Sequence, residues 1–108
     1  MNTKNLNQTM LLNNLRIEHN QKNQRFFVNL QNSQAYVQYE SEDQSVLDLK
    51  ETFVPEKVRE KGIGSTMVDH VLDYAKKENL EVIPTCPFVA DYIEENAEYQ
   101  DLVEDSGK

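Results

Sequence analysis

The sequence is organised around residues 54–77, and residues 58–65 at the centre of this stretch read VREKGIGS. A segment typical of a β-strand precedes the stretch, and Gly62 and Gly64 stand where an amphipathic helix is expected to begin. The first backbone N–H groups of a helix have no partner within it, and the helix dipole adds partial positive charge there. The cations that alternate before this helix are Lys57, Arg59 and Lys61. The stretch therefore predicts a site for a phosphate or diphosphate group.

Three interpretations of the glycine pair compete. A P-loop needs a lysine after its last glycine, whereas Lys61 precedes both glycines, so this interpretation fails. A dinucleotide-binding fingerprint needs glycine or alanine at the position of Met67, and it also needs a parallel strand-helix-strand unit. In the third interpretation, the glycines only make a tight turn before a helix and bind nothing.

The 108 residues fit one domain, expected over residues 15–103, with a flexible arm at residues 1–14 and an acidic tail at residues 104–108. The net charge is −8, and the whole excess of acidic residues lies in residues 51–108. Such a chain is expected to bind neither nucleic acid nor anionic membrane surfaces. One cysteine excludes an internal disulfide, and neither a signal peptide nor a membrane-spanning run is visible. The sequence therefore predicts a soluble cytoplasmic protein.

Runs that alternate apolar and polar residues predict four β-strands before the glycines. The runs lie near residues 15–17, 26–30, 35–39 and 46–53. Short polar turns separate the runs, and strands joined in this way, each with one apolar face, are typical of an antiparallel meander.

The apolar period changes at the glycines. Residues 63–75 carry one apolar stripe, which predicts a helix. Residues 80–86 show another strand pattern, but Pro84 would prevent this strand from pairing on both sides at the centre of a sheet. Pro87 can open a last helix, on which Phe88 is expected to face inward. Four strands followed by helix, strand and helix predict a mixed sheet of the α+β (mixed α/β) class.

Residues 59–64 have the spacing Arg/Gln-x-x-Gly-x-Gly/Ala, which resembles the acyl-CoA loop of the GNAT acyltransferase superfamily. The segments that support the resemblance are TFVPE at residues 52–56, PTCPFV at 84–89 and EYQDLV at 98–103. Together they are similar to small single-domain GNAT-like N-acetyltransferases, over about half the chain. The resemblance implies a truncated GNAT-like fold and an acetyl-CoA-dependent N-acyltransferase that moves an acetyl group to an amine.

The resemblance also implies which residues bind the cosubstrate acetyl-CoA. The strand before the loop would pair with the pantetheine arm through the backbones of Phe53 and Val54. The residues implied around the diphosphate are Arg59, Lys61, Gly62, Ile63, Gly64 and Ser65. The physical argument from the unpaired amides leads to the same atoms.

Three residues are candidates for the chemistry. Cys86 lies where the last strand pattern meets the last helix, and there it would act as acyl carrier or positioning group, with a packed core thiol as the alternative. Glu51 is a candidate base for the amine, at a position that often holds histidine in the resembling proteins. Tyr92 is a candidate acid for the leaving thiolate, with core packing as the alternative.

The acceptor side is expected to be shallow, because full-size GNAT enzymes place a helical pair between the first two strands and this chain has only a short turn there. An open cleft suits an amine that protrudes from a large partner. Alternatively, a second copy of the chain completes the wall of the cleft in a homodimer. His19 and His70 are isolated, so no metal site is expected. The alternative function is a non-catalytic CoA-binding or protein-interaction module with the same fold.

Overall fold

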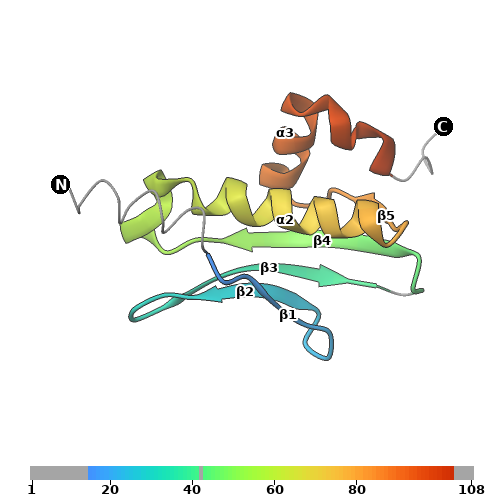
Figure 1. The fold of residues 1–108 in the computed structure, drawn as a ribbon. Helices are drawn as coiled ribbons and strands as arrows, with labels where there is room; N and C mark the ends of the chain where they lie inside the picture. The colour runs from blue at the N-terminus through green and yellow to red at the C-terminus, as the bar shows by residue number, and fades with distance from the viewer. Residues whose placement is uncertain (1–14, 42, 104–108) are drawn as a thin grey trace.

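The structure is a computed structural model that describes residues 15–41 and 43–103 (Figure 1). The predicted arm, residues 1–14, and the predicted acidic tail, residues 104–108, lie outside the described residues. The elements are the strands β1 (Glu18–Asn20), β2 (Arg25–Asn29), β3 (Gln34–Glu40), β4 (Val46–Phe53) and β5 (Glu81–Ile83), the α-helices α2 (Ile63–Lys77) and α3 (Pro87–Glu95), and the 3-10 helices η1 (Glu56–Lys61) and η2 (Ala97–Leu102). None of the described helices is long and apolar enough to cross a membrane.

The five strands form one sheet in the order β1-β2-β3-β4-β5. Strands β1 to β4 pair antiparallel with their neighbours, and β5 pairs parallel with β4. This arrangement confirms the predicted meander and the mixed sheet, but the first strand was predicted near residues 15–17 and is found at Glu18–Asn20, mostly within what was expected to be a polar turn. Strand β5 ends at Ile83, directly before Pro84, because proline has no backbone N–H with which to continue the pairing.

The connection between β1 and β2 is a turn of residues 21–24 and contains no helix. The fold therefore lacks the helical pair of full-size GNAT enzymes, as the sequence predicts. The sheet face opposite α2 carries an aromatic and polar layer, in which Arg25 lies over the Tyr36 ring at 3.8 Å and Tyr36 stacks on Phe53.

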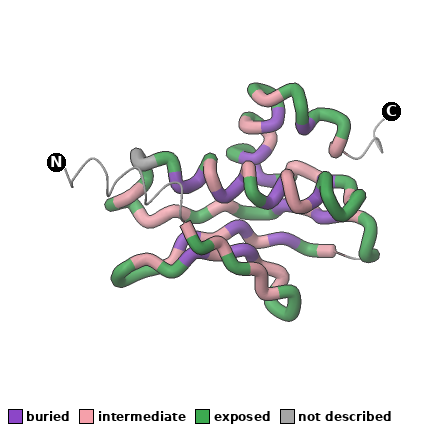
Figure 2. Tube along the Cα trace, viewed as in Figure 1, coloured by how far each residue is buried: buried purple, intermediate pink, exposed green. Residues whose placement is uncertain are grey.

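The core lies between the sheet and α2, which crosses one face of the sheet (Figure 2). The predicted apolar stripe is confirmed, and the buried residues of α2 are Ile63, Gly64, Met67, Val68, Val71, Leu72 and Ala75. Inward residues of β2, β3 and β4, such as Phe26, Val37 and Leu49, cover them from below. Helix α3 lies above α2 in Figure 1, and Val103 after η2 forms a parallel bridge with Val82.

Strand β4 contains a β-bulge. Tyr39 pairs with Leu49 and Gln38 pairs with Glu51, so Lys50 is the extra residue on β4. A bulge of this kind resets which side chains face which side of the sheet. As a result, both Leu49 before it and Thr52 after it lie on the side of α2, because Thr52 pairs with the inward residue Val37.

Strands β4 and β5 separate soon after they begin to pair. The parallel pairing covers only Val46 to Asp48 on β4, and a last bond joins the Cys86 N–H to the Leu49 carbonyl oxygen at 2.8 Å. Beyond Leu49, β4 continues to Phe53 without a partner on that side among the described residues, while the chain after Cys86 turns into α3. The separation leaves the end of β4 open along one edge.

We expect Leu72→Ala to lower the free energy of unfolding by about 2–5 kcal/mol, because it leaves a cavity in the core between α2 and the sheet. Leu72 is fully buried, whereas Asp91 is exposed on α3 and Asp91→Ala serves as the control. Urea denaturation of both variants measures the difference. A loss below about 1 kcal/mol for Leu72→Ala would contradict this placement of the core.

Candidate functional site

An open groove of about 320 Å³ lies between the end of β4, η1 and the first turns of α2 and α3. The residues that line it are Thr52, Phe53, Val54, Arg59, Gly62, Gly64, Ser65 and Phe88. Six of the eight residues predicted to bind the cofactor are among them. Of the other two, Ile63 has a fully buried side chain and can contribute only its backbone, and the side chain of Lys61 lies outside the described part of the chain.

The start of α2 is open to an anion. Gly62 precedes the helix with a φ of 78°, in the left-handed region that favours glycine. Its carbonyl oxygen accepts the Thr66 N–H at 3.0 Å, which closes the first turn. The N–H groups of Ile63, Gly64 and Ser65 come before that bond, and none of the described side chains caps them. These amides and the positive end of the helix dipole suit a phosphate group.

Arg59 is fixed beside these amides. Its Nε donates a hydrogen bond to the Val54 carbonyl oxygen at 2.8 Å, which ties η1 to the end of β4. A guanidinium has five N–H donors, so this bond leaves the terminal nitrogens for an anion. The same bond occupies the Val54 carbonyl, one of the backbone groups expected to meet the cofactor arm.

Gly64 allows two side chains to close over the start of the helix. A Cβ atom at Gly64 would lie 3.2 Å from Phe88 Cζ and 3.3 Å from Val54 Cγ2, which is tighter than ordinary packing. Phe88 is 42% exposed and Phe53 is 37% exposed, and they are the exposed large hydrophobic residues of the described chain. Both border the groove, but the Phe53 ring stacks on Tyr36 on the sheet face opposite α2, so the ring that presents apolar surface inside the groove is that of Phe88.

Cys86 lies at the inner end of the groove. The residue is 5% exposed, and its Sγ donates a weak hydrogen bond to Thr52 Oγ1 at 3.5 Å. Thr52 itself lines the groove. The thiol therefore lies directly behind a groove residue, at the point where β4 and the chain after β5 separate.

Glu51 does not line the groove. Successive side chains of a strand point to opposite faces, and Thr52 faces Cys86, so Glu51 faces away from the groove. Its side chain is exposed, on the face that also carries Gln38. The prediction that Glu51 lies near the cleft as a base is therefore corrected by the geometry, because the bulge at Lys50 sets the alternation of this part of β4.

Tyr92 is held away from the groove by hydrogen bonds on α2. Its hydroxyl donates to Asp69 Oδ1 at 3.0 Å, and the Tyr99 hydroxyl donates to the same oxygen at 2.7 Å. Burial, followed by the bond to Asp69, raises the pKa of Tyr92 to about 12. The pKa of Tyr99 is raised for the same reasons. Tyr92 does not line the groove, and its proton is held more firmly than that of a free phenol.

Two groove residues were not among the predicted site residues. Thr52 lies within the TFVPE segment that supports the resemblance. Simple strand alternation from the inward residue Leu49 would place Thr52 on the outer face, and only the bulge at Lys50 brings it to the side of α2. Phe88 was expected to face inward, but it is exposed at the groove. Its place in the first turn of α3, next to Pro87, is the signal that could have found it.

The two histidines approach one aromatic cluster. The His19 ring stacks on Phe26 with ring centres 3.9 Å apart, and the His70 ring meets Phe26 edge-on at 6.1 Å. Among the described residues, no group of three or more His, Cys, Asp or Glu side chains is placed to hold a metal ion. The cluster lies between the sheet and α2, where it also contacts Tyr74, and none of its residues lines the groove.

Comparisons with known proteins agree on one family. The sequence matches the GCN5-related N-acetyl-transferase model over residues 25–102. Human protein NATD1 is 31% identical over 84 residues, which cover 76% of this chain and 74% of that protein. The NATD1 protein of Danio rerio is 31% identical over 90 residues, which cover 82% of each. A solution structure of a GCN5-like protein from Staphylococcus aureus shares the fold, with a TM-score of 0.67 at 24% identity over 84% of this chain and 89% of that one.

We expect the tyrosines bound to Asp69 to make stability fall in strong alkali. A tyrosine whose pKa is higher in the folded than in the unfolded chain adds stability below its usual pKa of 10, and this contribution is lost as the pH rises toward 12. Asp69→Asn keeps the shape but removes the charge, so tyrosinate absorbance should appear at lower pH. Asp91→Asn, an exposed change on α3, is the control. Identical titration curves for Asp69→Asn and wild type would contradict the role of Asp69.

Proposed function

The chain belongs to the GCN5-related N-acetyltransferase family, and from this premise we propose that it binds acetyl-CoA in the groove and transfers the acetyl group to an amine. The observation that carries the proposal is that residues from β4, η1 and α2 converge on one groove at the uncapped start of α2. Their spacing in the sequence is that of an acyl-CoA loop.

The first turn of α2 is proposed to bind the diphosphate. The N–H groups of Ile63, Gly64 and Ser65 donate to the phosphate oxygens, and Arg59 adds a charged donor from the side of η1. Hydrogen bonds to charged groups contribute about 1.5–3 kcal/mol each. Several of them, less the cost of association, support a dissociation constant on the order of micromolar.

The pantetheine arm is proposed to lie along the open end of β4. Beyond Leu49 no described residue pairs with that strand on the side of β5, so its backbone can pair with the amides of the arm. The exposed ring of Phe88 lines the groove and would cover the aliphatic part of the arm. This course leads from the helix start toward Thr52 and Cys86.

Acetyl-CoA supplies the acyl group as a thioester. During transfer, the acceptor nitrogen forms a C–N bond and loses a proton, while the C–S bond breaks and the leaving thiolate gains a proton. Thr52 and Cys86 lie where the thioester would reach. Because Cys86 is 5% exposed and bonded to Thr52, it suits a positioning residue better than an acyl carrier.

The groove offers the acceptor no carboxylate or imidazole among the described residues that line it. Glu51 faces the other side of the sheet, and Tyr92 is bonded to Asp69. We therefore propose that the acceptor amine loses its proton to solvent, since the groove is open. An open acceptor side suits an amine that protrudes from a large partner.

The same observation favours a second candidate function. A groove without an acid or base along its described lining could bind CoA and catalyse nothing, as a CoA-binding or protein-interaction module does. Binding and turnover separate the two functions, because both predict CoA binding and only the first predicts transfer.

Arg59→Ala is expected to weaken CoA binding about tenfold or more, since it removes a charged donor to the diphosphate. Lys57→Ala is the matched control, because Lys57 is an exposed cation of η1 that does not line the groove. Isothermal titration calorimetry with CoA measures both. Equal losses in the two variants would indicate general attraction by charge and contradict the proposed groove. The absence of both heat and thermal stabilisation in wild type would also contradict it.

Transfer of acetyl from acetyl-CoA to a primary amine is expected to speed up as the pH approaches the pKa of that amine, because no groove residue removes its proton. Glu51→Gln should leave the rate unchanged, and Cys86→Ala should lower it more than Cys86→Ser. Release of free CoA, together with mass spectrometry of the amine, measures the rate. A loss of turnover in Glu51→Gln would contradict the assigned geometry.

If wild type binds CoA but acetylates none of spermidine, Nα-acetyl-lysine methylamide and a lysine-rich peptide, the enzyme proposal is wrong and the binding module stands. An acetyl group found on Cys86 itself would show that the thiol carries the acyl group rather than positions it.

A further inference from the structure

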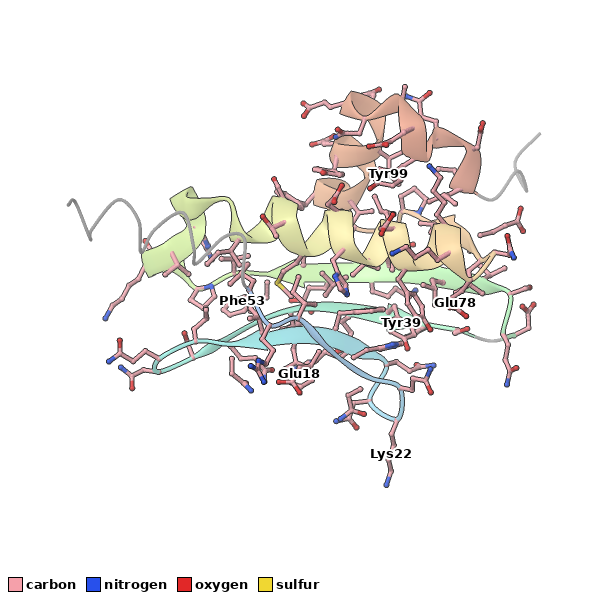
Figure 3. The ribbon with its side chains drawn as sticks, in the orientation of Figure 1. Glu18, Lys22, Tyr39, Phe53, Glu78 and Tyr99 are labelled. Atoms are coloured by element: carbon pink, nitrogen blue, oxygen red, sulfur yellow. The ribbon has the colours of Figure 1, made fainter. Side chains whose placement is uncertain are left out.

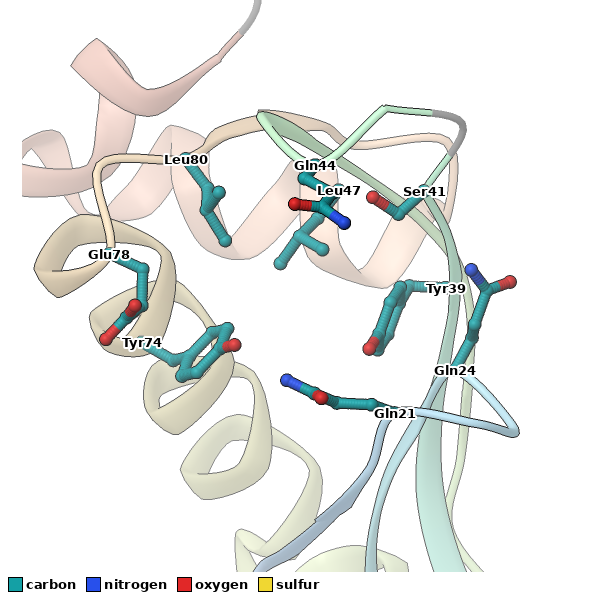
Figure 4. A pocket seen from close by; sticks show the side chains of 9 residues that line it. All are labelled: Gln21, Gln24, Tyr39, Ser41, Gln44, Leu47, Tyr74, Glu78 and Leu80. Carbon is teal, nitrogen blue, oxygen red and sulfur yellow. The ribbon is translucent and has the colours of Figure 1, made fainter.

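A second cavity, of about 500 Å³, lies at the far end of α2 from the groove (Figure 4). Its walls come from the β1–β2 turn, the β3–β4 region, the start of β4 and the C-terminal end of α2. Gly64 and Glu78 line one cavity each, and they are about 20 Å apart at the usual rise of an α-helix. Figure 3 shows Phe53 near one end of α2, and Tyr39 and Glu78 near the other.

The far cavity is separate from the groove because the core lies between them. Leu49, Val71 and Leu72 are fully buried under the middle of α2. A small molecule in the far cavity therefore makes no contact with one in the groove.

The charge of the far cavity is negative. None of its lining residues is a lysine or an arginine, and Glu78 supplies a carboxylate. No described lysine or arginine forms a salt bridge with Glu78. The neighbouring lysines are engaged elsewhere, because Lys77 Nζ lies 3.2 Å from Asp73 and Lys76 lies over the Tyr99 ring. The C-terminal end of α2 adds the negative end of the helix dipole.

Two aromatic rings form opposite sides of this cavity. Figure 4 shows Tyr39 from the sheet and Tyr74 from α2 on either side of the space, with the Gln21 side chain pointing toward Tyr74. Tyrosine faces attract cations through the negative face of the ring. Leu47 and Leu80 add apolar surface beside them.

The Tyr39 hydroxyl is held as a hydrogen-bond acceptor for the cavity. Its oxygen lies 2.6 Å from His19 Nε2. Burial lowers the pKa of His19 and raises the pKa of Tyr39, which favours the neutral form of both, and the His19 tautomer sets which of them donates. In either tautomer the Tyr39 oxygen keeps a lone pair for a donor from a ligand.

The backbone around the far cavity is unusual. Gln24 and Asn79 are the non-glycine residues with positive φ in the described chain, at 56° and 59°. Gln24 lines the cavity, and Asn79 stands between two residues that line it, Glu78 and Leu80. The Gln24 carbonyl accepts the Tyr39 N–H at 2.9 Å, which fixes the turn against β3. Left-handed backbone at non-glycine residues is often associated with binding sites.

We propose that this cavity binds a small organic cation that carries a primary alkylammonium group. The ammonium donates a hydrogen bond to the Glu78 carboxylate on the α2 side, and the organic part of the cation extends past Tyr74 and Leu47 toward Tyr39 on the opposite wall. An anion would meet an unpaired carboxylate and no cation in the described lining, so the cavity selects against it. This proposal does not depend on acetyl transfer in the groove.

The test is an NMR titration of the whole protein with n-butylammonium, n-butanol and butyrate at constant ionic strength. We expect saturable shifts of the amide signals of Tyr39, Tyr74 and Glu78 with the cation alone, and no shifts at Gly62 or Gly64. Shifts of equal size with butanol, or shifts that do not saturate, would overturn the proposal.

Glu78→Gln should weaken n-butylammonium binding about tenfold or more, because the mutation removes a charged acceptor and keeps the shape. Glu94→Gln, an exposed change on α3, removes the same charge elsewhere and should leave binding unchanged. Equal losses of affinity in both variants would mean that the cation is attracted by the net negative charge of the chain and not by Glu78, and this would overturn the proposal.

The alkylammonium group can come from a free amine or from a lysine side chain. A second titration with Nα-acetyl-lysine methylamide distinguishes these sources. Tighter binding of n-butylammonium indicates a free amine, and tighter binding of the lysine derivative indicates a peptide. Both outcomes support the cation site, whereas binding of neither would reject it.

Discussion

The parting of β4 from β5 after Leu49 is the constraint on which the rest of the groove depends. Two parallel strands that stayed paired would bury the end of β4 and leave no room between it and α3. Pro84 prevents further pairing of β5, and the bond from the Cys86 N–H to the Leu49 carbonyl marks the last contact. The free edge of β4 therefore lies beside the start of α2. An extended molecule with an anionic end can meet donors from both elements at once.

The bulge at Lys50 decides which chemistry the groove can contain. Without the extra residue, Glu51 would lie on the side of α2 and Thr52 on the other. With it, a hydroxyl and a thiol border the groove, and the carboxylate faces the opposite side of the sheet. A single inserted residue thus removes the candidate base from the site. This geometry makes solvent the acceptor of the amine proton in the enzyme proposal, and the same geometry is what favours the alternative of a binding module.

Periodicity was enough to predict the meander, the stripe on α2 and the mixed sheet, because those features depend on which side chains must leave water. The loop residues from Arg59 to Ser65 were predicted because a helix start and two glycines have a local chemical meaning. Glu51 and Phe88 were misplaced for the opposite reason. The face of Glu51 depends on a bulge that no apolar pattern reveals, and the exposure of Phe88 depends on a gap between two elements distant in sequence. The cavity around Glu78 joins four segments, so no single stretch could predict it.

Helix α2 connects the two cavities through one physical property. Its peptide dipoles make the N-terminal end positive and the C-terminal end negative, and each end lies at a cavity whose side chains have the matching sign. Arg59 reinforces the positive end and Glu78 the negative end, while the lysines of the last turn are directed to Asp73 and Tyr99. If the lysines of the last turn faced the end of α2, they would neutralise the negative end of its dipole, and the cavity at Glu78 would not be negative. The arrangement instead keeps the two ends opposite in charge, so one helix can serve an anionic cofactor at its start and a cation at its end.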